Sequence, residues 1–489
     1  MQYIFQGGKK VYGIRIDPAT AAISAARDFL ADSGVRTWLV GGTVRDLLLE
    51  RESGDIDLVT DGPPEETARR FADRIGGSYF QLSEEFQSCR VITGDRRNTY
   101  DFASLRGAGI EDDLSQRDFT VNAIAARLAD GEITDPLGGL ADLEARLLVP
   151  LDDAIFDHDP LRLLRALRLE KELDLRISGQ LKSLIRSKSV LATRPAVERV
   201  WAELSRLLEA PGAARAIRRM DELGLLEVLL PEIYALKGVA QNDYHHLDVY
   251  NHVLAATEAL DGIIEDPSVL FPGQAEKIVE RSNQRIAGDA SWRFVMSYSA
   301  IMHDVAKPGC RFTDDSGDFR FFEHDRIGAE MVSETLARMR ASAETAKAIT
   351  LLVANHMRFE GLKHDFPPSR RARLRYFRAT EPYTPEAIML SVSDQLSVRG
   401  PKTMDAAIEK HLRLASEMMA ESFAVEEAEA LPKLVRGDEL MQELALDPGP
   451  LVGLLLARIL EEQTLGNISS RREALELAAR IKLEGDLEK

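Results

Sequence analysis

The sequence changes character at residues 135–139, Asp-Pro-Leu-Gly-Gly, and this change constrains the fold more than any other feature. Before it, short β-rich runs alternate with a helical pattern at Pro64–Ile75. After it, strand signals almost vanish, and Pro- and Gly-containing breaks separate helical stretches as far as the C-terminus. We therefore expect an α/β head followed by three helical regions. The expected strands are Thr37–Val40, Ile56–Thr60, Ser78–Gln81, Ser88–Thr93 and Thr99–Ser104.

Length and composition favour a multidomain cytoplasmic protein. A chain of 489 residues is too long for one hydrophobic core and suggests about three or four domains. No apolar run reaches the length of a membrane span, and the first residues lack the apolar core of a signal peptide. Two cysteines are too few for a disulfide framework or a cysteine zinc site.

The net charge of −18 argues against a nucleic-acid partner only at first sight, because a phosphate backbone interacts with a local patch. The segment from Leu151 to Met220 holds 14 Lys and Arg against 10 Asp and Glu, a net charge of +4. Arginines on a helix are more often a solvated face, so this segment alone is weak support for binding RNA.

Two glycines and two carboxylates make the first candidate site. A strand that runs into Gly41-Gly42 before a helix lets backbone N–H groups, with Arg45 nearby, approach a triphosphate. Asp55 and Asp57 are two residues apart on a strand, so both side chains point to one face, where a hard cation such as Mg²⁺ would relieve their repulsion. Asp101 on a later strand is the best third carboxylate. A lone Gly-Gly turn or D-x-D pair is usually structural; the combination at this spacing is far more specific.

At this point the sequence resembles the nucleotidyltransferase superfamily of DNA polymerase β type. The run Arg117-Asp118-Phe-Thr-Val-Asn122, followed by 135–139, narrows the resemblance to class II tRNA nucleotidyltransferases (CCA-adding enzymes) and bacterial poly(A) polymerases. The resemblance implies an α+β fold with a mixed sheet in the head, Mg²⁺, and nucleotide contacts from Gly42, Arg45, Arg117, Asp118 and Asn122. Gln116 replaces a basic residue that is usual in this family.

A second motif, His158-Asp159-Pro-Leu-Arg162-Leu-Leu-Arg165, starts the helical neck. Pro160 predicts a helix start with Asp159 as its N-cap, and Asp159 and Arg162 then share a helical surface. The commoner interpretation is an exposed ion pair. The family's base-selecting motif resembles this segment, which implies that Asp159 and Arg162 pair with cytosine or adenine and that Arg165 lies near the nucleotide. The role of His158, which stands where Glu is usual, stays open.

A neck helix follows at 195–204. The resemblance implies that this helix closes the site, and that Glu198 and Arg199 hold a helix–helix junction rather than touch substrate.

Six of the nine histidines lie between residues 245 and 356, interleaved with carboxylates. Imidazole and carboxylate ligands suit Mn²⁺, Ni²⁺, Fe²⁺ or Mg²⁺. The set resembles the HD phosphohydrolase superfamily, which implies a divalent transition metal on His252, His303, Asp304 and Asp394. His324 and His356 match positions that complete a second metal site or bind phosphate. The alternative is a degenerate HD fold kept for packing and tRNA contact.

The resemblance covers nearly the whole chain and implies a nucleotidyltransferase head (1–150), a neck (151–220), an HD body (221–400) and a helical tail (401–489). The implied partners are tRNA, CTP and ATP, with no membrane; the oligomeric state stays open. The product stays open between CCA, CC, a single A and poly(A). The connection from Ser104 to Asp113 lacks the family's flexible loop, which favours CC. The competing function is an HD phosphohydrolase with a vestigial head, and the intact head motifs argue against it.

Overall fold

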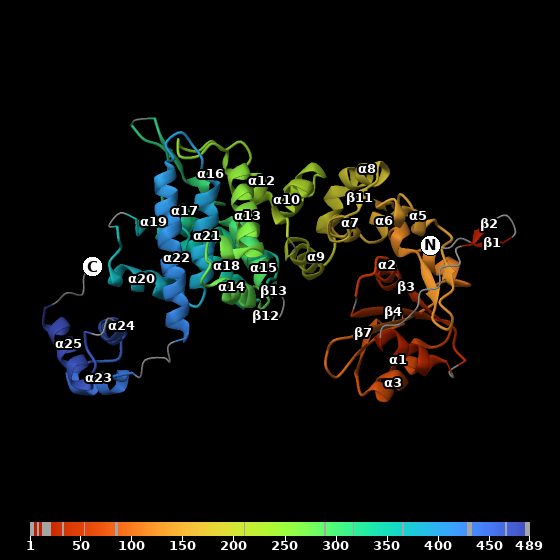
Figure 1. Ribbon diagram of the computed structural model, residues 1–489, viewed down its shortest axis with the longest axis horizontal. Helices are drawn as coiled ribbons and strands as arrows, with labels where there is room; N and C mark the ends of the chain where they lie inside the picture. Colours follow the sequence, from red (N-terminus) through yellow and green to blue (C-terminus); the bar gives the residue numbers. More distant parts are fainter. Residues whose placement is uncertain are drawn as a thin grey trace. The chain divides into compact units, whose positions relative to one another are not determined.

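The computed structural model (Figure 1) describes residues 4–6, 9–11, 21–31, 34–52, 54–83, 87–209, 211–287, 290–315, 317–363, 366–427, 433–464 and 467–484. The chain divides into two units. The first consists of Met1–Glu203 and Arg219–Leu229, and the second of Leu204–Arg218 and Leu230–Lys489.

A seven-stranded mixed sheet, ordered β5-β6-β7-β4-β3-β8-β9, forms the centre of the first unit. β4 and β7 run parallel, and the other neighbours are antiparallel. All five expected strands are present, with ends that agree within two residues. The strands are β3 (Thr37–Val40), β4 (Asp55–Thr60), β5 (Ser78–Ser83), β6 (Ser88–Ile92), β7 (Thr99–Ser104), β8 (Ala125–Arg127) and β9 (Ile133–Thr134). A separate hairpin joins β1 (Ile4–Gln6) and β2 (Lys9–Val11).

Two helices, α1 (Ala21–Leu30) and α3 (Pro64–Ile75), contribute to the hydrophobic core on one face of this sheet. α3 has the expected bounds: Pro64 stands in its first turn, and Gly76 ends it in the left-handed conformation. Its Phe71 ring packs 4.8 Å from Tyr100 and 5.7 Å from Phe102, centroid to centroid. Because alternate residues of β4 and β7 fill this core, their other residues point to the opposite face.

That opposite face is partly covered. Val40 and Val59 pack there with Leu114 at the end of α4 (Ile110–Ser115), in a smaller buried cluster. Three further elements complete the head: α2 (Gly42–Leu48), η1 (Thr120–Asn122) and α5 (Gly139–Glu144).

Helices dominate the rest of the first unit. The elements are β10 (Leu147–Leu148), α6 (Ile155–His158), α7 (Arg162–Glu172), β11 (Arg176–Ile177), α8 (Gly179–Lys188), η2 (Ser189–Thr193) and α11 (Leu226–Leu229). Two further helices, α9 (Val197–Glu209) and α10 (Ala213–Glu222), contain residues assigned to both units.

The predicted N-cap role of Asp159 is wrong. Asp159 is extended and ends α6, Pro160 and Leu161 form a turn, and α7 begins only at Arg162 with Leu161 as its N-cap residue. The Asp159 carboxylate accepts a hydrogen bond from the Leu161 N–H (3.3 Å), which stabilises this turn rather than the helix end.

The second unit contains a helical body (Figure 1). Its central helices are α13 (Val249–Glu265), α15 (Trp292–Met302), α17 (His324–Arg338), α18 (Ala343–Asn355), α21 (Thr384–Ser397) and α22 (Asp405–Glu427). Smaller elements are α12 (Pro231–Tyr234), η3 (Pro267–Val269), α14 (Ala275–Ser282), β12 (Arg285–Ala287), β13 (Ala290–Ser291), α16 (Lys307–Cys310), β14 (Arg311–Thr313), β15 (Phe319–Phe321), α19 (Arg358–Gly361) and α20 (Arg370–Thr380). The last three helices, α23 (Gly437–Leu444), α24 (Pro450–Thr464) and α25 (Arg471–Glu484), pack on a core of their own.

Candidate active site

The parallel pairing of β4 with β7 brings the predicted head carboxylates together. Asp57 is the direct cross-strand partner of Asp101, and Asp55 lies two residues before Asp57 on the same face. Burial, followed by the neighbouring charge of Asp101, raises the pKa of Asp57 to about 6. A bound cation would offset both effects, so this group of oxygens suits a divalent metal.

The Gly-Gly turn lies against these carboxylates. Gly41 has a φ of 62°, and a Cβ there would lie 3.0 Å from Arg117 Nη1 and 3.3 Å from Asp57 Oδ2. Any side chain would therefore enter the site, and glycine is required both for the backbone conformation and for space.

Two residues that the sequence analysis did not single out shape the carboxylate group. Thr43 Oγ1 donates to the Asp55 carbonyl (3.2 Å) and accepts from the Asp57 N–H (2.7 Å), which fixes α2 to β4. Arg90, on β6, donates from Nε and Nη2 to the two oxygens of Asp101 (2.8 and 2.7 Å). Alternation along the strand could have indicated Arg90, because it places Arg90 on the face opposite the buried Cys89 and Val91.

Four of the predicted nucleotide-binding residues form a connected network. Arg45 Nη1 donates to Asn122 Oδ1 (2.6 Å), and Asn122 Nδ2 donates to Asp118 Oδ1 (2.9 Å). Arg165 Nη1 donates to Asp118 Oδ2 (3.3 Å). Although burial acts to raise it, Arg165 and the Asn122 amide hold the pKa of Asp118 below its usual range. The network keeps Asp118 ionised and connects it through Asn122 to Arg45. Arg117 instead pairs with the buried Asp113 (2.7 Å).

Asp159 and Arg162 do not pair with each other. Asp159 Oδ2 accepts a hydrogen bond from Arg199 Nη2 (3.1 Å). This bond joins α9 to the turn between α6 and α7, at a helix–helix junction of the kind expected for Arg199. Arg162 Nη1 donates to the Ile155 carbonyl (3.4 Å), while its buried Nε has no hydrogen-bond partner in the part of the chain that the structure describes. A buried unpaired donor is costly unless a ligand satisfies it. His158 is exposed.

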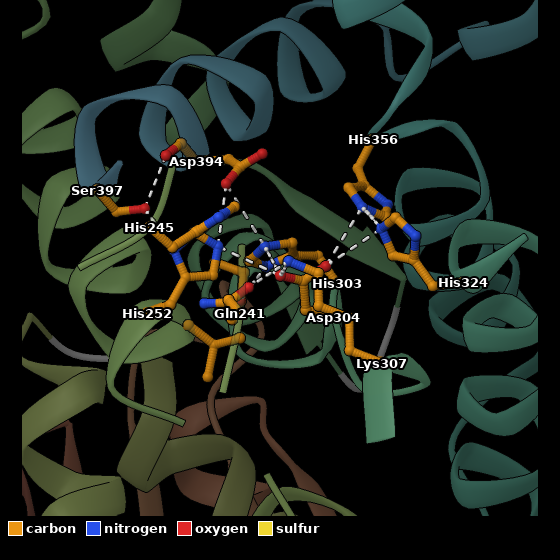
Figure 2. Close-up of polar contacts among 12 residues, drawn as sticks. Gln241, His245, His252, His303, Asp304, Lys307, His324, His356, Asp394 and Ser397 are labelled. Carbon is orange, nitrogen blue, oxygen red and sulfur yellow. Dashed lines mark hydrogen bonds and ion pairs between the residues drawn. The ribbon is translucent and has the colours of Figure 1, made fainter. Parts of the chain in front are cut away.

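Four histidines and Asp394 of the second unit converge around Asp304 (Figure 2). His252 on α13 and His303 after α15 bring Nε2 within 3.2 and 3.3 Å of Asp304 Oδ2. His324 and His356 bring Nε2 within 3.3 and 3.7 Å of the other oxygen, Oδ1. Asp394 of α21 joins from the His252 side, with Oδ1 3.1 Å from His252 Nε2. All six predicted residues therefore meet, and Asp304 lies between two groups of ligands.

The hydrogen bonds of the outer ring nitrogens determine which nitrogen of each neutral histidine carries the proton. Nδ1 of His303, His324 and His356 lies 2.6 to 2.8 Å from a backbone carbonyl, which can only accept. Ser397 Oγ already donates to the Asp394 carbonyl, so Nδ1 of His252 donates to Ser397 (3.0 Å). In each neutral ring the inward Nε2 therefore carries the lone pair that a metal can bind.

These lone pairs need a cation. The Nε2 atoms of His324 and His356 are 3.2 Å apart, although neither carries a proton in its neutral form. Two facing lone pairs repel unless a metal or a proton lies between them. The Asp304 pKa is well below its usual range, because Lys307 (2.6 Å away) and His303 outweigh the effect of burial. The donor set therefore fits a divalent metal centre.

Three known families match this chain. The family described as poly A polymerase head domain matches residues 37–149, the probable RNA- and SrmB-binding site of polymerase A matches 174–236, and the HD domain matches 293–399. An A-adding tRNA nucleotidyltransferase of Deinococcus radiodurans is 33% identical, covering 89% of this chain and 93% of that protein. The chain belongs to the tRNA nucleotidyltransferase family.

Other relatives of this tRNA nucleotidyltransferase differ in product. A CC-adding tRNA nucleotidyltransferase of Thermus thermophilus is 34% identical, covering 89% of this chain and 91% of that protein. A solved Thermotoga maritima CCA-adding enzyme complexed with tRNA has the same fold, with a TM-score of 0.57 at 20% identity over 95% of this chain and 97% of that one. Both the head and the HD families are metal-dependent. No helix in the described ranges is long and apolar enough to span a membrane.

Proposed function

We propose that this chain adds C, A or both to the 3′ end of tRNA, with CTP and ATP as donors and without a nucleic-acid template. The observation that carries the proposal is the group of Asp55, Asp57 and Asp101 beside the Gly41-Gly42 turn, in a chain whose relatives are named for this reaction.

Asp55 and Asp57 would hold Mg²⁺, and Asp101 completes the group. When bound, the metal neutralises phosphate charge and aligns the triphosphate with the attacking 3′-hydroxyl. Gly42 leaves room for the triphosphate, and Arg45, Arg117, Asp118, Asn122 and Arg165 would contact the phosphates and sugar of the nucleotide.

Asp159 and Arg162 would select the base. Cytosine and adenine each present an amino donor beside a ring-nitrogen acceptor, which match a carboxylate and a guanidinium. Uracil and guanine reverse that order and would leave both protein groups unpaired. The unpaired Nε of Arg162 supports this role, because a base acceptor would satisfy it.

The product that we propose is CC. The connection after β7 is short and structured: Gly107 has a φ of 85°, the Ala108 N–H donates to Asp112 (2.7 Å), and α4 begins at Ile110. Such a connection leaves little chain to reshape the base pocket from cytosine to adenine, and a misplacement of ~1 Å can cost a hundredfold in rate.

The test supplies labelled CTP and ATP separately and together to tRNA transcripts that lack CCA, lack CA or lack only A. We expect two C residues on the first transcript and a stop before A. Efficient A addition to tRNA ending in CC would show a full CCA-adding or A-adding enzyme, and long A tracts without C would show a poly(A) polymerase.

The second candidate activity is metal-dependent phosphoester hydrolysis in the body, supported by the inward lone pairs around Asp304. We expect purified wild-type protein to contain a divalent transition metal that the His303→Ala/Asp304→Ala double variant has lost. Elemental analysis of both proteins measures this. His246→Ala, an exposed histidine outside the cluster, should keep the wild-type metal content. Equal metal in all three proteins would favour a packing role.

The proposed domains are the head (1–150), the neck (151–220), the HD body (221–400) and the tail (401–489). The proposed location is the cytoplasm, because the proposed substrate is tRNA.

A further inference from the structure

Four side chains form a row across the sheet, on the face that carries the head carboxylates. Asp57 of β4 pairs in register with Asp101 of β7, Asp101 with Arg90 of β6, and Arg90 with Phe80 of β5. Directly paired residues point to the same face, so Phe80 shares the face of the carboxylates and not that of the Phe71 core.

The row becomes more exposed away from the metal-binding end. The side chains of Asp101 and Arg90 are 30% and 40% exposed, and Phe80, on the last strand of the sheet, is exposed over 48% of the whole residue. Phe80 is not part of the Phe71 core, whereas Tyr79, its neighbour on the opposite face, packs against that core. The position next to the carboxylates points to a ligand of the transfer reaction.

We infer that Phe80 is a stacking platform for a base near the 3′ end of the tRNA, with Arg90 as the polar group between that base and Asp101. The inference rests on the proposed function. The acceptor end is single-stranded, and proteins hold such nucleotides by stacking unpaired bases on aromatic rings and guanidinium planes.

Geometry sets which nucleotides can reach the ring. Neighbouring strands are about 4.8 Å apart, so β5 lies about 10 Å from β7 and about 14 Å from β4, which carries Asp55 and Asp57. Stacked bases are about 3.4 Å apart, so the ring can meet a base within about four nucleotides of the 3′-hydroxyl at the carboxylates. The incoming nucleotide, held by Asp118, Asn122 and Arg165, lies on other elements, so Phe80 should affect tRNA and not CTP.

The test compares wild type, Phe80→Ala, Phe80→Tyr and Phe312→Ala in steady-state C addition. We expect Phe80→Ala to raise the KM for tRNA by about tenfold with the KM for CTP unchanged, because each stacked base contributes that order of affinity. Phe80→Tyr should restore the KM. Phe312 of β14, 56% exposed in the second unit, is the matched control for loss of an exposed ring. Circular dichroism checks that each variant folds.

A set of acceptor-stem minihelices, each with a single abasic nucleotide at one of the last four positions, makes the test sharper. For wild type, one abasic position should raise the KM as much as Phe80→Ala does, and the variant should lose nothing further at that position. An unchanged KM for tRNA in Phe80→Ala would overturn the stacking inference alone. The stacking inference would also be wrong if the only effect of Phe80→Ala were a change in self-association, which light scattering measures. A wild-type protein that transfers no nucleotide would overturn the proposed function as well.

Discussion

Asp55→Asn and Asp57→Asn are each expected to lower nucleotide transfer to tRNA by at least about a thousandfold, because each variant removes one anionic ligand from the metal that neutralises the triphosphate. Initial rates with labelled CTP and saturating Mg²⁺ measure this loss. Asp61→Asn is the matched control: Asp61 directly follows β4 but pairs with Arg36 (2.6 Å) and should leave the rate unchanged. Near-normal transfer by both site variants would contradict the head assignment.

The fold of Asp57→Asn can be checked through the pH dependence of its stability. The folded pKa of Asp57, about 6, lies above its ordinary value of 3.8, so the folded state binds this proton more tightly than the unfolded state. The folded state is therefore less stable with Asp57 ionised than with Asp57 protonated. The stability that the protonated form contributes is lost as pH rises from about 4 through 6. In metal-free buffer Asp57→Asn should resist urea better than wild type at pH 7.5 and equally well at pH 4. Added Mg²⁺ should reduce the difference at pH 7.5.

Arg162→Ala is expected to lower the preference for CTP over UTP by about tenfold or more, with tRNA affinity little changed. The reason is that Arg162 would donate to a base edge, where an unmatched buried group costs ~1–3 kcal/mol. Competing incorporation of the two nucleotides gives the preference, and filter binding gives the tRNA affinity.

Arg176→Ala serves as the control for Arg162→Ala, because Arg176 is an exposed arginine of the same basic segment and should leave base preference intact. If Arg162→Ala keeps its discrimination against UTP while tRNA affinity collapses, Arg162 binds backbone phosphate and the base-selecting role is wrong.

Local pattern predicted much of the head. Five of the seven strands in the head sheet and α3 were predicted closely, because period-two alternation and a Pro–Gly frame are properties of neighbouring residues, whereas the short strands β8 and β9 were not predicted. The N-cap prediction for Asp159 was wrong because it used the local pattern alone. The pattern indicates a helix start near Pro160, but the turn that ends α6 decides where α7 begins.

The sequence by itself determined which chemical groups this protein has: the carboxylates of β4 and β7, the glycine turn, the neck arginine and the set of histidines. Only the tertiary structure decided how they pair. Strand register pairs Arg90 with Asp101 and Phe80 with Arg90. The packing of α9 makes Arg199, rather than Arg162, the partner of Asp159. Carbonyls one turn away orient the rings of His324 and His356 toward each other. The physical reason is that residue type and spacing are local, whereas a side chain's partner depends on which distant backbone segments pack against it.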